Sequence, residues 1–94
     1  MKNDKKIMDP KKELLLKVVG SIIKEKRLAK HKGILLLSYE YDIANSSIAL
    51  LEKGVRDVQF CTLWKLANAF GMSFSEFIQE VETRLPEGFK LIED

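Results

Sequence analysis

Residues 43–54 read IANSSIALLEKG and contain the signals for the start, the buried face and the end of one short helix. Ile48 and Leu51 have the i, i+3 spacing of a buried helix face, and Gly54 stands where a helix commonly ends in a left-handed residue. The residues before Ile48 belong to the polar types that often cap the start of a helix: Asn45, Ser46 and Ser47. We therefore expect a short helix over residues 45–53.

The residues before this stretch predict two more helices. An apolar run at residues 34–37 begins a helix that continues to about Tyr41, and a tight turn separates it from the next helix. Residues 30–33 form a connector. Before the connector, apolar residues recur at the period of an amphipathic helix over about residues 11–28: Leu15, Val18, Val19, Ile22 and Ile23.

Two helices are expected after residue 58. The first has an apolar face at Leu63, Leu66, Ala67 and Phe70, and Gly71 ends it. The second begins with Ser73 and Glu76, the two residues of a capping box, and stops before Pro86. Residues 89–92 alternate weakly like a short strand. The predicted fold class is therefore all-α, with five helices, and the alternation at residues 89–92 leaves a short C-terminal strand open.

Size and composition restrict the protein to one small domain. The chain has 94 residues, a mass of 10.8 kDa and 46% hydrophobic residues, enough for a single core. The longest apolar runs are far below the roughly 18 residues of a membrane span, and no secretory signal precedes the helices, so we expect a cytoplasmic location. The single cysteine, Cys61, fits a reducing compartment, and its apolar neighbours predict that it is buried.

Charge divides the chain although the formal net charge is only +2. Residues 1–32 carry eleven basic and four acidic side chains, whereas residues 33–94 carry five basic and ten acidic ones. Such asymmetry favours a polyanionic partner. We expect a flexible basic arm over residues 1–10, the folded domain over 11–85 and a tail over 86–94.

Two segments of the chain resemble the phage repressor and Cro-like (XRE-type) helix-turn-helix family. These are residues 43–54, with Glu52 and Gly54 in a Glu-x-Gly motif, and residues 62–73, which read TLWKLANAFGMS. The resemblance implies sequence-specific binding of double-stranded DNA by a transcriptional regulator. It places the helix at 45–53 in the major groove, which an α-helix of about 10 Å diameter fits.

The resemblance also assigns DNA-contacting residues. Asn45 and Ser46 occupy base-reading positions, and asparagine can pair with adenine through two hydrogen bonds. Ala44 and Ala49 are small enough for close approach and for contact with a thymine methyl group. Leu50 departs from the polar reader common in the family, which leaves apolar contact with DNA or packing against a partner.

Phosphate contacts are expected from basic side chains and from the first backbone N–H groups of the second and third helices. The residues assigned to this role are Lys30, Lys32, Gly33, Ser47, Lys53 and Arg56. A separate structural role follows from the resemblance for Arg27 and Glu52, which match the positions of an ion pair linking the first helix to the recognition helix.

Dimer formation is expected because a domain this small covers little DNA alone, and a two-fold dimer would match two half-sites about one helical turn apart. Trp64 lies outside the apolar face of its helix, and a role in an interface and packing against the C-terminal tail explain this position equally well. A strand at the C-terminus would also need a partner, which adds Phe89, Leu91 and Ile92 to the expected interface.

The sequence also bears on functions other than DNA binding. The sequence has no metal-ligand cluster, phosphate loop or nucleophile and base set, so we expect neither an enzyme nor a cofactor, a metal or a small-molecule ligand. Ordinary helix capping by Asn45, Ser46 and Ser47 and solvated charge at Lys53 and Arg56 are the plainer alternatives. The main rival is a helix-turn-helix domain used for protein contact, through Leu35, Leu36, Leu50 and Trp64.

Overall fold

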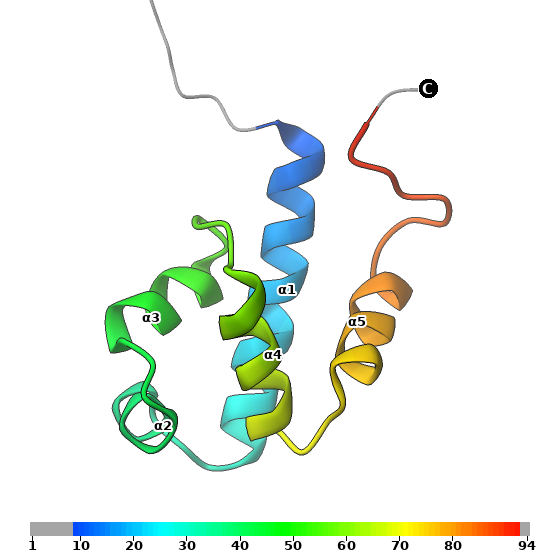
Figure 1. Cartoon of the computed structure of the whole chain (residues 1–94). Helices are drawn as coiled ribbons and strands as arrows, with labels where there is room; N and C mark the ends of the chain where they lie inside the picture. Colours follow the sequence, from blue (N-terminus) through cyan, green and yellow to red (C-terminus); the bar gives the residue numbers. More distant parts are fainter. Residues whose placement is uncertain (1–8, 93–94) are drawn as a thin grey trace, which may run out of the picture.

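The computed structural model describes residues 9–92, and these form five helices joined by short connections (Figure 1). The helices are α1 (Pro10–Ala29), α2 (Ile34–Tyr41), α3 (Asn45–Lys53), α4 (Phe60–Ala69) and α5 (Phe74–Thr83). The all-α, five-helix prediction is confirmed. Of the expected arm, residues 1–8 lie outside the described residues, and Pro10 is already the first residue of α1.

The short C-terminal strand is not formed within the described residues. Residues 86–92 continue as turns and bends, with the Phe89 N–H donating to the Pro86 carbonyl at 3.0 Å and Gly88 at a φ of 75°. A strand needs another strand edge with which to pair, and residues 9–92, whose regular elements are helices, offer none. The weak alternation of residues 89–92 was therefore insufficient to define a strand.

Every helix contributes to one core. The largest fully buried side chains are Phe77, Ile22, Ile23, Leu37, Ile48 and Leu66, which come from all five helices. The prediction that Cys61 is buried was wrong, since its side chain is exposed. Leu63, Leu66 and Ala67 fix the inward face of α4, and Cys61 lies on the opposite side of that helix.

The close approach of α1 to α3 depends on two glycines. A Cβ atom on Gly20 would lie 2.3 Å from the Leu51 carbonyl oxygen. A Cβ atom on Gly54 would lie 2.9 Å from the Cα of Lys17, and Gly54 also has a φ of 72°. The backbones of the two helices therefore meet at a distance that no larger side chain allows.

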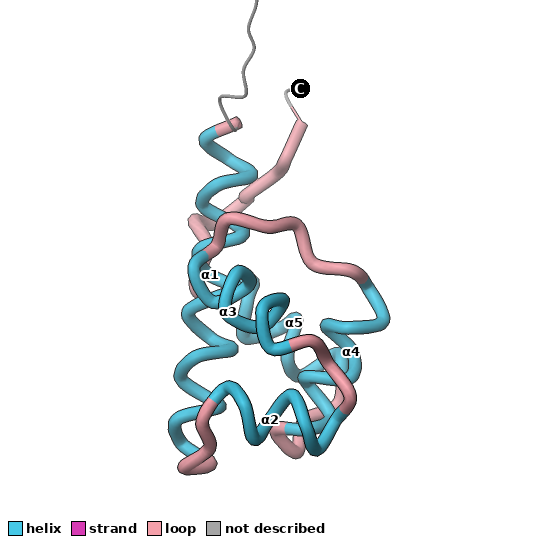
Figure 2. Tube along the Cα trace, turned by 90° about the vertical axis from the view of Figure 1, so that its left-hand side faces the viewer, coloured by secondary structure: helices cyan, strands magenta, loops and turns pink. Residues whose placement is uncertain are grey.

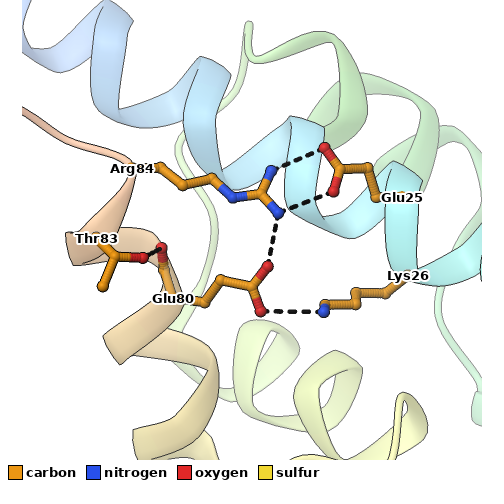
Figure 3. Close-up of polar contacts among 5 residues, drawn as sticks. All are labelled: Glu25, Lys26, Glu80, Thr83 and Arg84. Atoms are coloured by element: carbon orange, nitrogen blue, oxygen red, sulfur yellow. Dashed lines mark hydrogen bonds and ion pairs between the residues drawn. The ribbon is translucent and has the colours of Figure 1, made fainter.

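An ion-pair network joins the other side of α1 to α5 (Figure 3). Arg84 donates to both carboxylate oxygens of Glu25, at 2.7 and 2.8 Å, and to Glu80 at 2.6 Å. Lys26 completes the network with a 3.0 Å contact to Glu80. The pKa of Glu80 is lowered, first by the hydrogen bond from Lys26 and then by that from Arg84.

The capping box at α5 is formed as predicted. The Glu76 N–H donates to the Ser73 hydroxyl at 3.1 Å, and the Ser73 N–H donates to the Glu76 carboxylate at 2.8 Å. Gly71 takes the predicted left-handed conformation at the preceding turn, with a φ of 78°.

Over the described residues, no helix has the length and apolar composition needed to cross a bilayer.

Candidate nucleic-acid interface

The helices α2 and α3 form a helix-turn-helix unit on one side of the molecule (Figures 1 and 2). Three residues connect them. Asp42 ends α2 in the left-handed conformation, with a φ of 55°, which aspartate tolerates because its short side chain is polar. Ile43 is 8% exposed and anchors the turn in the core, and Ala44 is the N-cap of α3.

The inward face of α3 is set by Ile48 and Leu51, which are 0% and 4% exposed. The predicted DNA-contacting residues therefore lie on the surface or at its edge. Exposed are Ala44, Asn45, Ser46 and Lys53, and half-buried are Ser47, Ala49 and Leu50. The structure thus brings the five predicted base-reading residues together on one helix and its N-cap.

The polar side chains at the start of α3 do not cap the helix. The N-cap is Ala44, which offers no side-chain acceptor, and α3 has no side-chain cap hydrogen bond. Asn45 and Ser46 are the first two residues of the helix itself, and both are exposed. The simple capping role considered for these residues is therefore wrong, and their side chains point to solvent.

The five helices differ in how their N-termini are satisfied. Side chains of Asp9 and Ser73 cap α1 and α5, whereas α2, α3 and α4 have Gly33, Ala44 and Gln59 as N-caps and no side-chain cap hydrogen bond. The first N–H groups of a helix carry a partial positive charge and favour anions. The open starts belong to the two helices of the helix-turn-helix unit and to the helix that follows it.

A polar hollow of about 280 Å³ lies between α3 and the start of α4. Its lining comprises Ser47, Leu51, Arg56, Asp57, Gln59 and Thr62. Arg56 donates to the Ser47 hydroxyl at 3.4 Å, so two of the predicted phosphate-contacting residues meet here. The sequence interpretation missed Gln59 and Thr62, although a polar residue just before a helix of apolar period is a signal for such a site.

A buried ion pair fixes α3 to α1, as predicted for Arg27 and Glu52. The Arg27 Nε and Nη2 atoms donate to the two carboxylate oxygens at 2.6 and 2.9 Å, and the side chains are 9% and 7% exposed. The hydrogen bond with Glu52 raises the pKa of Arg27 against the opposing effect of burial. The remaining nitrogen, Nη1, donates to the Lys32 carbonyl at 2.9 Å. One guanidinium group therefore holds α1, α3 and the connector before α2.

The two lysines of that connector are placed differently from the other predicted phosphate contacts. The Lys32 ammonium donates to Glu40 and lies 5.4 Å from the centre of the Tyr41 ring. The hydrogen bond with Glu40 raises the pKa of Lys32. Because of this pairing, a phosphate would have to displace Glu40 to reach Lys32. Lys30 is directed toward the turn between α4 and α5, where its Nζ is 4.0 Å from the position that a Cβ atom on Gly71 would occupy.

The residues predicted for a dimer interface lie in two places. Trp64 is 46% exposed and stacks on Phe74 at 4.6 Å between ring centroids, with Phe60 edge-on to both rings. Trp64 therefore packs against Phe60 of its own helix and Phe74 of α5. Phe89, Leu91 and Ile92 line an apolar groove of about 620 Å³ between α1, α5 and the tail.

Within residues 9–92, His, Cys, Asp and Glu side chains nowhere gather in groups of three or more that could hold a metal ion. Comparisons with protein-family models, with curated proteins and with solved structures gave no match. The functional interpretation therefore depends on the chemistry of this chain's own surface.

Proposed function

We propose that this protein binds double-stranded DNA with sequence preference, as a transcriptional regulator of the helix-turn-helix type. The observation that carries the proposal is the outward face of α3, where Asn45 and Ser46 are exposed and take no part in capping. The buried Arg27–Glu52 ion pair fixes the same helix to α1. A short, braced helix with polar side chains at its start is the arrangement that major-groove readers use.

Base reading in this proposal begins at the N-terminus of α3. Asn45 accepts from and donates to the major-groove edge of adenine, and Ser46 serves several bases with a single hydroxyl group. Ala44 and Ala49 allow the helix backbone to approach the base edges. Lys53, exposed at the other end of the helix, faces the sugar-phosphate backbone.

Phosphate binding in this proposal uses the open helix starts. The N–H groups at the beginnings of α2 and α4 donate to phosphate oxygens on either side of the groove that α3 enters. Arg56 and Gln59 lie at the polar hollow beside α4 and add side-chain donors there. Neutralised phosphates release counterions, so binding weakens as the salt concentration rises.

In this proposal a homodimer extends the length of DNA that so small a domain contacts. The nine residues of α3 span only a few base pairs, and two copies would contact half-sites about one helical turn apart. Two apolar surfaces are available for the contact, the aromatic cluster around Trp64 and the groove lined by Phe89, Leu91 and Ile92.

The test is a salt series of duplex binding measured by fluorescence anisotropy. We expect Asn45→Ala to relax the preference at one base pair by about 1–3 kcal/mol, and Arg56→Ala to weaken all sequences alike and to flatten the salt dependence. Lys26→Ala is the charge-matched control, because Lys26 contacts Glu80 of α5, away from α3 (Figures 1 and 3). Equal losses for Asn45→Ala at every base pair would contradict the base-reading role.

A second candidate function is protein contact through the same unit. The observation that favours it is the apolar surface of α2, where Leu35 is 70% exposed and Tyr39 86% exposed. The sequestration of Lys32 by Glu40 points in the same direction, since it removes one cation from this side. Failure to bind any duplex at low salt would favour this function over DNA binding.

A further inference from the structure

The middle of α3 places apolar side chains at the edge of the face that is proposed to contact DNA. Between Ser47 and Glu52 the helix has four side chains without a polar atom, of which Ile48 and Leu51 are buried. The other two, Ala49 and Leu50, are half-buried at the edge of the outward face. Glu52 forms the buried ion pair with Arg27, so Lys53 carries the first exposed charge that follows these apolar residues along the helix.

An apolar surface has only one apolar partner among the base edges of the major groove. Guanine, cytosine and adenine present nitrogen and oxygen donors and acceptors there, and thymine adds its 5-methyl group. Leucine placed against a nitrogen or oxygen atom removes water from that atom without replacing the hydrogen bond, which is unfavourable. Leucine placed against a methyl group buries apolar area on both partners.

We infer that Ala49 and Leu50 recognise the 5-methyl group of thymine, so that the site carries thymine opposite the middle of α3. The inference rests on the proposed function and adds to it the class of base sequence that is bound. Leu50 is one turn beyond Ser46, a rise of roughly 6 Å, or about two base steps at 3.4 Å each. The thymines therefore lie about two base pairs from the pair that Asn45 and Ser46 read.

The methyl group is also what separates thymine from cytosine on this surface. Both pyrimidines have a ring carbon at position 5, but only thymine carries a methyl group there. Burial of one methyl-sized group changes an equilibrium constant by about fourfold. Leu50 thus supplies a modest preference for thymine over cytosine. A polar side chain at the same position would instead select a base by its hydrogen-bonding pattern.

The experiment is a thymine-to-uracil scan of a duplex obtained by selection from random sequences. Each substitution removes one methyl group and leaves every hydrogen-bonding atom of the base pair in place. The wild-type protein should lose about fourfold in affinity at one or two thymines per half-site and be unaffected elsewhere. This arm needs no variant of the protein, so it does not depend on whether a variant folds.

Two leucine variants then locate the contact. Leu50→Ala should abolish the uracil effect at the thymine that Leu50 contacts, whereas Leu28→Ala removes the same atoms from an exposed position at the end of α1 and should leave the effect intact at every thymine. Retention of the full uracil effect at every thymine by folded Leu50→Ala would overturn the role of Leu50. Strong binding of the selected duplex with no uracil effect at any thymine would overturn methyl reading while leaving DNA binding in place. Absence of any preferred duplex would overturn the proposed function, and this inference with it.

Discussion

Removal of the Glu52 carboxylate is expected to destabilise the fold strongly. In Glu52→Ala, Arg27 loses two hydrogen bonds to a charged group, at 2.6 and 2.9 Å, each worth about 1.5–3 kcal/mol. The Arg27 side chain is 9% exposed, so water does not replace them, and a buried charge is left with the Lys32 carbonyl as its remaining partner. Together these effects give a loss of about 3–5 kcal/mol, a large share of the stability of a small domain.

Urea and thermal unfolding, followed by the helical circular dichroism signal, measure this loss. A domain of this size loses about 4–8 °C in Tm per kcal/mol, so the variant should melt at least ~12 °C below wild type. The double variant Arg27→Met with Glu52→Leu should recover much of the stability, because it leaves no buried charge. Glu13→Ala is the control, since Glu13 and Lys17 form an exposed pair at 4.0 Å. A Glu52→Ala protein that melts at the wild-type temperature would refute the claim that this pair holds α3 on α1.

Three further predictions follow from the packing, the capping and the ion pairs. Gly20→Ala should cost about 1–3 kcal/mol in urea unfolding although alanine is the better helix former, because its Cβ would lie 2.3 Å from the Leu51 carbonyl oxygen. The neighbouring Ser21→Ala, on the exposed side of α1, should be neutral or slightly stabilising, and equal midpoints for both variants would contradict the close approach. Ser73→Ala should lower the free energy of unfolding by about 1 kcal/mol through loss of the capping box, and an unchanged urea midpoint would contradict that role. The lowered pKa of Glu80 gives the folded state fewer bound protons than the unfolded chain, so its stabilising contribution is present above the ordinary value of 4.5 and is lost as the pH falls through the folded pKa. Wild type should therefore lose more stability than Glu80→Gln between pH 7 and pH 3.5, and parallel losses would show that the network with Lys26 and Arg84 does not contribute.

Local signals in the sequence predicted most of the fold because they act within a few residues. Gly54 and Gly71 adopt the left-handed conformations expected at helix ends, and Ser73 with Glu76 forms the expected capping box. The periods of apolar residues located the five helices, and α3 has the predicted bounds. Each of these features depends on the chain near it and not on how the helices are arranged in space.

Features that depend on contacts between distant segments were harder to predict. Cys61 has apolar neighbours in sequence, yet the inward face of α4 is set by Leu63, Leu66 and Ala67. The pairing of Lys32 with Glu40 depends on α2 placing Glu40 beside the connector that precedes the helix, and the composition of the segment does not predict that arrangement. The identity of the α3 N-cap also escaped prediction, because Asn45 and Ser46 are common capping residues, whereas the N-cap is Ala44 and Asn45 is already the first residue of the helix.

The candidate site was predicted in part. The outward positions of Asn45, Ser46 and Lys53 agree with the sequence interpretation, and Arg56 lies near Ser47 as part of one polar hollow. Gln59 and Thr62 were not foreseen, because their role depends on how closely the start of α4 approaches α3. The contacts of all these residues with DNA remain predictions.

The most direct test of DNA recognition by α3 is the selection of binding sites from random double-stranded DNA. The wild-type protein should enrich a defined sequence, with adenine among the bases read by α3, and its affinity for that sequence should fall steeply as the salt concentration rises. The same selection with Asn45→Ala should lose the preference at one base pair while the rest of the sequence is retained. Enrichment of no sequence by the folded wild-type protein, together with no duplex binding at low salt, would contradict the account.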